Sequence, residues 1–168
     1  SIYGLSKLYS EKVFERLKKN KIKVTIFRLF NIYGPGQDLK NLYQGMFSIY
    51  LAQALKKNKI EVTGSLNRYR DFVYISDTIN ALLINPKKKK NWLMNLGLGK
   101  KYKVKNVIDI ILRELNNKKI KIIEKNSFSE DTFGSYANNS KLRSEGWRPK
   151  YNFMMGARKT INEIEKKK

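Results

Sequence analysis

A tyrosine and a lysine near the amino end of the sequence have the types and spacing of an acid/base pair. Tyr3 and Lys7 are four positions apart. On a helix this spacing places both side chains on one face, one turn apart. An ammonium beside a phenol stabilises the phenolate, so the proton leaves more easily than from an isolated phenol. Such a pair can take a proton from a hydroxyl group and return it. The spacing also fits a tyrosine packed at a helix start beside a solvated lysine.

Helical and strand patterns alternate around and after this pair. Apolar residues recur at helical intervals over 3–19, and the nearly continuous apolar run over 23–33 predicts a strand buried on both faces. A functional loop is expected at its carboxyl end, where Gly34-Pro35-Gly36 stops it. The later pattern predicts helices over 41–57, 78–84, 104–115, 140–145 and 153–166, and strands over 60–63, 71–75, 92–98 and 119–124. This alternation predicts an α/β fold.

The composition excludes several classes of site. The 168 residues are enough for one domain with a real core. The sequence has no cysteine and no histidine, which excludes disulfides, thiolate zinc sites and Ser-His hydrolase chemistry. We therefore expect no metal and a cytoplasmic setting. No secretory signal precedes Tyr3 and no apolar run could span a membrane, so we expect no membrane partner. Because the sequence begins with Ser and carries the pair at its amino end, we expect a piece of a longer protein.

The net charge of +22 has two interpretations. One is a nucleic-acid-binding module. The other is composition, because lysine, asparagine and isoleucine are all abundant and all have AT-rich codons. The run from Lys87 to Lys90 follows Asn85-Pro86 and is typical of a solvated loop. Neither an RNA-binding aromatic motif nor zinc-finger spacing accompanies the charge. We therefore expect no nucleic-acid partner, although a diffuse positive field could attract an anionic substrate.

Five short motifs then occur in an order that is typical of one enzyme family. The sequence resembles the extended short-chain dehydrogenase/reductase family, specifically its NAD-dependent nucleotide-sugar epimerases and dehydratases, and UDP-glucose 4-epimerase-like enzymes most closely. The motifs are Tyr3-Gly4-Leu5-Ser6-Lys7 for Y-G-x-S-K, Arg28-Leu29-Phe30-Asn31-Ile32-Tyr33-Gly34-Pro35-Gly36-Gln37 for R-x-F-N-x-Y-G-P-x-Q, Arg70-Asp71-Phe72-Val73-Tyr74-Ile75-Ser76-Asp77 for R-D-F-V-Y-V-x-D, Asn95-Leu96-Gly97 for N-x-G, and Gly146-Trp147-Arg148-Pro149 for G-W-x-P. The resemblance covers essentially the whole chain.

The resemblance implies the C-terminal half of such an enzyme. Its fold would be the C-terminal part of a Rossmann-type doubly wound sheet plus a small α/β substrate-binding subdomain. Residues 1–40 would end the NAD-binding domain and carry the Tyr/Lys helix. Residues 41–168 would be mainly the substrate-binding subdomain, with segments 70–85 and 92–98 interleaved into the sheet. The family also implies a homodimer through the Tyr/Lys helix, where Leu5, Leu8 and Phe14 could serve either the interface or the core.

The resemblance also implies roles for individual residues. Tyr3 would exchange a proton with the sugar 4-hydroxyl while hydride moves to or from nicotinamide. Lys7 would lower the tyrosine pKa and hydrogen-bond the nicotinamide ribose, so both residues are expected to be catalytic and cofactor-binding. Asn31, Arg70 and Asp131 are the expected substrate-binding residues, the first two at the diphosphate. Asn31 could instead cap a turn, and Arg70 could form a surface ion pair.

Three further residues have structural expectations. Asp77 is expected to cap the helix over 78–84, a role that Ser76 could also fill, and it could anchor a loop. Arg28 is expected to be structural. Trp147 is expected to pack the terminal helix against the core.

The sequence also departs from the family pattern. It lacks the Gly-rich phosphate loop, the acidic residue for the adenosine ribose and the Ser or Thr upstream of the catalytic tyrosine. Where many relatives have R-x-G-D, it has Phe128-Ser129-Glu130-Asp131, and Thr63 replaces an apolar residue beside the base. We therefore expect most of the NAD site to lie in a missing N-terminal half, and this stretch alone neither to bind NAD tightly nor to turn over.

The function we expect for the complete enzyme is UDP-hexose 4-epimerisation through transient oxidation at the sugar 4-position. The alternatives within the family are a nucleotide-sugar 4,6-dehydratase and a reductase. The alternatives outside it are a non-catalytic remnant and a basic nucleic-acid-binding module.

Overall fold

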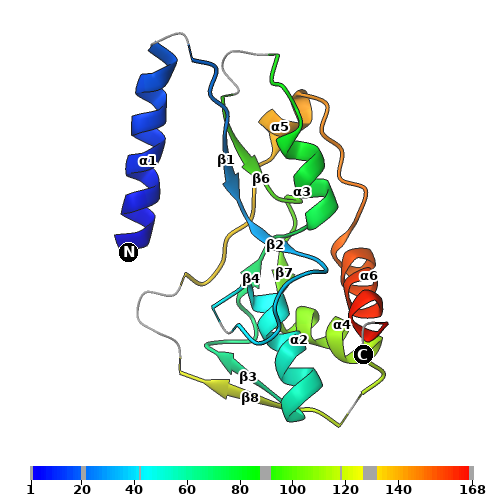
Figure 1. Ribbon diagram of the computed structural model, residues 1–168. Coiled ribbons are helices and arrows are strands. Elements are labelled where there is room, and N and C mark those ends of the chain that lie inside the picture. The colour runs from blue at the N-terminus through cyan, green and yellow to red at the C-terminus, as the bar shows by residue number, and fades with distance from the viewer. Residues whose placement is uncertain are drawn as a thin grey trace.

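The chain forms alternating helices and strands, as the sequence predicts. The computed structural model describes residues 2–19, 22–41, 43–87, 92–117, 119–126 and 132–166 (Figure 1). Its elements are α1 (Ile2–Lys19), β1 (Ile26–Leu29), β2 (Asn31–Tyr33), α2 (Met46–Lys57), β3 (Lys59–Thr63), β4 (Tyr69–Arg70), β5 (Phe72–Tyr74), α3 (Ile75–Leu82), β6 (Leu93–Leu96), β7 (Tyr102–Lys103), α4 (Val104–Glu114), β8 (Lys121–Lys125), α5 (Ser140–Ser144) and α6 (Phe153–Glu165). No helix in these ranges has both the length and the apolar character needed to cross a bilayer.

The strands associate mainly in parallel pairs. β1 pairs with β6, β2 with β5 and β3 with β8, all in parallel, while β4 and β7 are antiparallel. The single strand expected over 23–33 is divided, because the chain changes partner at Phe30. The N–H of Phe30 donates to the carbonyl of Leu96 on β6, and the next N–H, of Asn31, donates to the carbonyl of Asp71 before β5. One apolar run therefore supplies two strands.

The expectation that this run is buried on both faces is wrong for β1. Arg28 and Leu29 on this strand are exposed, Leu29 by 51%. β2 behaves differently, because its last residue, Tyr33, is fully buried. The difference arises because helices pack over β2, whereas an open groove separates β1 from α1.

The main core lies where α2, α4 and α6 enclose the strands β2, β3 and β5. Aromatic rings fill its centre, with Tyr33 contacting Phe47, Phe72 and Phe153 at centroid separations of 5.0, 6.2 and 5.2 Å. The Tyr33 hydroxyl donates to the carbonyl of Phe153 at 2.9 Å, and burial raises the pKa of this phenol. This core fixes β2 and β5 against the terminal helix.

A second, smaller core lies between α3, β5, β6 and α5. Its buried residues are Val73, Ala81, Met94, Leu96, Leu98, Leu142 and Trp147. Trp147 donates its indole N–H to the carbonyl of Asp77 at 3.0 Å. The expectation that Trp147 packs the terminal helix is therefore wrong, because the indole instead closes the cluster beside α3.

Two helices begin at different places from those expected. α2 begins at Met46 rather than at Asn41, whose side chain instead accepts the N–H of Tyr43 in a turn. α3 begins at Ile75, and neither Ser76 nor Asp77 caps it. The carboxylate of Asp77 accepts the N–H groups of Lys150 and Tyr151, both at 2.9 Å. Asp77 is therefore a loop anchor.

The helix α1 stands apart from both cores. Figure 1 shows it alongside β1 and running in the opposite direction. Every side chain from Ile2 to Arg16 except that of Glu11 is exposed. Glu11 forms a two-point ion pair with Arg28 on β1, with N–O distances of 2.7 and 2.6 Å. Arg28 thus has the structural role expected for it, fastening α1 to the strand.

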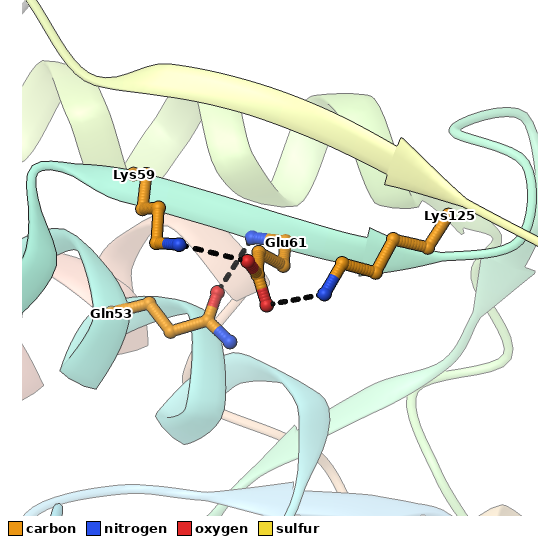
Figure 2. Close-up of polar contacts among 4 residues, drawn as sticks. All are labelled: Gln53, Lys59, Glu61 and Lys125. Atoms are coloured by element: carbon orange, nitrogen blue, oxygen red, sulfur yellow. Dashed lines mark hydrogen bonds and ion pairs between the residues drawn. The ribbon is translucent and has the colours of Figure 1, made fainter.

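At the opposite end of the molecule, polar contacts hold the β3–β8 pair (Figure 2). The carboxylate of Glu61 on β3 contacts the ammonium groups of Lys59 at 3.0 Å and Lys125 at 2.8 Å. The side-chain oxygen of Gln53 on α2 accepts the backbone N–H of Glu61 at 2.7 Å. The hydrogen bonds from Lys125 and Lys59 lower the pKa of Glu61 from 4.5 to about 2.

We predict that Glu61 titrates with a midpoint of about 2 in an NMR titration of the side-chain carboxyl carbon. Because the folded-state pKa lies below the unfolded value of 4.5, this group's contribution to stability is complete above pH 4.5 and declines as the pH falls towards 2. Lys125→Met should move the midpoint upwards. Lys121→Met, on the same strand but outside the contact, should leave it unchanged. A midpoint near 4.5 in the unsubstituted chain would contradict the prediction.

Candidate active site

The expected acid/base pair lies on the side of α1 that faces β1. The Nζ of Lys7 is 5.1 Å from the centroid of the Tyr3 ring, as one helical turn requires. Both side chains line an open groove of about 840 Å³ between α1 and residues 24–29. Because α1 runs opposite to β1, its amino end lies towards the carboxyl end of that strand (Figure 1). Ligands of α/β sheets bind at this end of the strands.

Away from the pair, the groove is largely apolar and is crossed by one ion pair. Leu8 and Phe14 line it from α1, and Phe27 lines it from β1. Glu11 and Arg28 also line it, and the hydrogen bonds from Arg28 lower the pKa of Glu11, although burial opposes this change. The groove can therefore accept an apolar group next to a phenol and an ammonium.

Asn31 lies at the start of β2, directly after the change of partner. Its side-chain N–H donates to the carbonyl of Asp71 at 2.8 Å. The amide nitrogen has two N–H groups, so this bond leaves one donor for another acceptor. Asn31 therefore links β2 to the residue before β5, and its second N–H group can still donate to an anionic ligand.

Arg70 lies on β4 in a half-buried, positively charged environment. Its Nη1 donates to the carbonyls of Tyr69 at 2.9 Å and Phe133 at 3.3 Å. Burial lowers the pKa of the Arg70 guanidinium, and the charge of Arg68 lowers it further. Arg68 is itself buried and donates to the carbonyls of Thr63 and Ser65. Two guanidiniums therefore lie near each other, which favours binding of an anion.

Asp71 is the residue that joins these parts. It is fully buried, and its carboxylate accepts the N–H groups of Leu98 at 3.0 Å, Gly99 at 2.8 Å and Ala137 at 3.0 Å. Burial raises the pKa of Asp71, and the bonds from backbone amides oppose that rise. A Cβ on Gly97 would lie 2.7 Å from the carboxylate, so the motif Asn95-Leu96-Gly97 requires glycine to admit Asp71.

The structure thus groups the expected site residues into two places. Tyr3 and Lys7 share the groove of α1. Asn31 bonds to the carbonyl of Asp71, and Arg70 precedes Asp71 in the chain, where β2, β4 and β5 meet. The residues that line the groove do not include Asn31 or Arg70. Asp131 lies outside the described residues.

Two important residues were missed by the sequence reasoning. The sequence analysis gives Asp71 no role beyond its place in the R-D-F motif, although a carboxylate at the start of a buried apolar strand signals a need for hydrogen-bond donors. It gives no role to Arg68. Its signal was the spacing of two positions from Arg70, which places both side chains on one face of an extended segment.

We predict that Asp71→Asn lowers the free energy of unfolding by about 1–3 kcal/mol. The new amide group turns a donor towards backbone N–H groups, so at least one of them loses its acceptor. Urea unfolding would measure the change, and the amides of Leu98, Gly99 and Ala137 should exchange with solvent faster. Asp109→Asn is the matched control, because Asp109 is exposed on α4. Equal unfolding midpoints for the two variants would refute the role given to Asp71.

Parallel strand pairs covered by helices, with a tyrosine–lysine pair towards the carboxyl end of β1, are the features of an α/β domain of the doubly wound class. Residues 1–97 match the NAD dependent epimerase/dehydratase family, and the chain belongs to this family. The resemblance to extended short-chain dehydrogenases/reductases and the Rossmann-type α/β fold are both confirmed.

Individual relatives agree with this assignment. The chain is 34% identical over 165 residues to a Methanocaldococcus jannaschii protein whose assignment as a UDP-glucose 4-epimerase is itself inferred; the match covers 96% of this chain and 52% of that protein. It is 29% identical, over the same shares, to the dTDP-4-dehydro-6-deoxyglucose reductase of Escherichia coli. The crystal structure of the Thermotoga maritima UDP-glucose 4-epimerase with UDP-glucose superposes with a TM-score of 0.90 at 26% identity, covering 98% of this chain and 53% of that one. The chain therefore spans about half the length of the relatives it matches.

Proposed function

We propose that this chain is the C-terminal half of an NAD-dependent nucleotide-sugar 4-epimerase acting on a UDP-hexose. The observation that carries the proposal is the Tyr3/Lys7 pair, one turn apart in an open groove at the carboxyl end of β1. The similarity to UDP-glucose 4-epimerases over nearly the whole chain supports the same reaction. In this proposal residues 1–40 belong to the cofactor domain, and residues 41–168 belong mainly to the substrate subdomain.

The residues present fit the family's cofactor. The groove offers an apolar wall beside the pair, which suits a planar ring, and Lys7 supplies a donor for a ribose hydroxyl. When bound, NAD supplies the hydride acceptor and donor for chemistry at the sugar carbon. We assign Tyr3 and Lys7 to the cofactor contact from this chain and the rest of the NAD site to the other half of the enzyme.

Tyr3 performs the proton transfer. Its phenolate oxygen takes the proton of the sugar 4-hydroxyl as that carbon is oxidised, and gives the proton back when the carbon is reduced from the other face. Lys7 stabilises the phenolate through its charge. Both groups come from one helix, one turn apart, so they are already neighbours before substrate arrives.

Asn31 and Arg70 hold the substrate diphosphate. The second N–H of the Asn31 amide and the half-buried guanidinium of Arg70 are donors, and the charge of Arg68 adds to the field around them. We also assign Asp131 to substrate binding, from its place in the family motif. We attribute the net charge of +22 to composition, and no nucleic acid enters the proposal.

A second candidate reaction is reduction or dehydration of a related nucleotide sugar. The similarity to the Escherichia coli reductase over nearly the whole chain favours keeping it. Epimerisation, reduction and dehydration would all use the same Tyr/Lys pair, so the product of the complete enzyme distinguishes them. Interconversion of UDP-glucose and UDP-galactose supports epimerisation, and a 4-keto-6-deoxy product from the complete enzyme overturns it in favour of dehydration.

The outer side of α1 supports a homodimer. Leu5 lies outside the groove lining and is 67% exposed, whereas Leu8 and Phe14 line the groove. The apolar side chains away from the groove form a helical stripe composed of Ile2, Leu5, Tyr9 and Val13. We assign this stripe to contact with the same stripe of a second subunit.

We predict that Tyr3→Phe in the complete enzyme lowers kcat for UDP-glucose epimerisation by about 10²–10⁴-fold, because the proton acceptor is removed. Coupled measurement of UDP-galactose formation would check this. Tyr9→Phe is the matched control, because Tyr9 is on the same helix but outside the groove, and it should retain activity. Equal activity of the two variants would exclude Tyr3 as the acid/base.

A further inference from the structure

The segment over 133–137 is joined to β4 by two backbone hydrogen bonds. The N–H of Tyr69 donates to the carbonyl of Phe133 at 3.3 Å, and the N–H of Ser135 donates to the carbonyl of Tyr69 at 3.4 Å. Together they form a single parallel bridge between Tyr69 and Gly134. Both distances are long for backbone hydrogen bonds. The bridge therefore depends on further contacts to hold the segment in place.

The guanidinium of Arg70 lies across this bridge. Its Nη1 donates to the carbonyl of Tyr69 at 2.9 Å and to that of Phe133 at 3.3 Å. The two acceptors of this nitrogen are thus the same two carbonyls that close the bridge. A guanidinium is planar and its donors are fixed relative to one another, so holding one nitrogen limits where the others point. The direction of Arg70 therefore depends on the geometry of the bridge.

The side chain of Tyr69 packs against the segment that forms the bridge. Its ring centroid lies 6.1 Å from that of Phe133 and 6.5 Å from that of Tyr136. The Nζ of Lys101 lies over both tyrosine rings, 5.1 Å from the centroid of Tyr69 and 4.6 Å from that of Tyr136. An ammonium over the face of a ring is attracted to it electrostatically. Lys101 therefore links the ring on β4 to a ring on the segment.

Glycine at position 134 lets the backbone of the segment lie directly against the Tyr69 ring. A Cβ at this position would lie 2.4 Å from both Cε1 and Cζ of the ring and 2.6 Å from Cε2. Any other residue would therefore move either the ring or the segment. The ring also contacts Phe133, Tyr136 and Lys101, so moving it disturbs those contacts as well.

We propose that Tyr69 and Gly134 are positioning residues for Arg70. The ring holds the 133–137 segment against β4, and the carbonyls of the bridge then aim the guanidinium at the substrate diphosphate. Lys101 contributes by lying over the ring. The inference rests on the proposed function for the target of the guanidinium, but its orientation can be measured without substrate.

Rotation of the Arg70 guanidinium in this chain tests the first step. NMR gives its rate from the exchange between the two Nη resonances. Gly134→Ala should raise the rate at least about threefold, because Nη1 loses a hydrogen bond. Gly45→Ala is the matched control and should leave the rate unchanged. A Cβ there would meet only the carbonyl of Ile32 at 3.6 Å, which is an ordinary contact.

A second set of variants adds no atoms beside the bridge. Lys101→Met removes the ammonium from the rings and should raise the rotation rate of Arg70 by about twofold, because a cation–π contact at an exposed site is weak. Lys105→Met is the matched control, because Lys105 is exposed on α4. Tyr69→Phe keeps the ring and should leave the rate unchanged.

Binding of UDP to the complete enzyme tests the second step, because UDP carries the diphosphate and is not turned over. Gly134→Ala should raise the Kd for UDP, measured by calorimetry, by about threefold or more. In an Arg70→Ala background the same substitution should raise the Kd no further, because a positioning residue acts only through the group that it positions.

An unchanged rotation rate in a folded Gly134→Ala chain would overturn the proposal. If that chain does not fold, an unchanged rate in Lys101→Met would overturn it. An equal rise in Kd with and without Arg70 would overturn it in favour of a general structural role for the segment. If Gly134→Ala frees the guanidinium but Arg70→Ala leaves UDP binding unchanged, the positioning is supported and the diphosphate contact in the proposed function is contradicted.

Discussion

The buried carboxylate of Asp71 and the three amides that donate to it hold together segments that are far apart in the sequence. A carboxylate removed from water costs several kcal/mol unless partners replace its hydration. Here Leu98, Gly99 and Ala137 are those partners, so the loop after β6 and the segment before α5 must both reach the start of β5. The room that the carboxylate needs also explains why residue 97 is glycine, because a Cβ there would collide with it. One charge thus determines where both of these segments can lie.

The position of the candidate ligand-binding residues follows from this anchor. Asn31 bonds to the carbonyl of Asp71 through both its backbone and its side chain. Arg70 precedes Asp71 directly, and its guanidinium reaches the carbonyl of Phe133 in the segment that leads to Ala137. A shift of the Asp71 backbone would therefore move Asn31 and Arg70 together. The packing around Asp71 therefore sets where these two candidate donors lie, although its carboxylate bonds to neither of them.

The sequence predicted the elements better than their connections. Period 3.6 located α1, α4 and α6 to within a few residues, and the spacing of Tyr3 and Lys7 correctly placed them on one face. The partner change at Phe30 could not be read, because a strand that moves to a new neighbour keeps the same alternation of side chains. The starts of α2 and α3 were missed because a turn at Asn41 and a distant loop at Lys150 competed for the expected caps.

The candidate site shows the same difference between local features, which the sequence predicts, and distant contacts, which it does not. Local spacing sufficed for the Tyr3/Lys7 geometry, because both residues lie on one helix. Asp71 and Arg68 act through backbone atoms, and those of Asp71 are 27 or more positions away. Nothing in a single sequence marks which carbonyl or amide will be nearby. The order of the motifs identified the family, whereas the role of Asp71 beneath those motifs is visible only in the folded chain.

The side chain of Gln53 gives the two ends of the molecule different tendencies to self-associate. By accepting the N–H of Glu61, it closes the edge of β3 that faces away from β8, and the flanking charges of Lys59 and Lys125 discourage another strand from approaching (Figure 2). The folded chain is therefore protected at this end against edge-to-edge aggregation. Aggregation through strand edges should begin instead at β1, which pairs only with β6 among the described strands. Substitutions meant to raise solubility would have to be made on that strand.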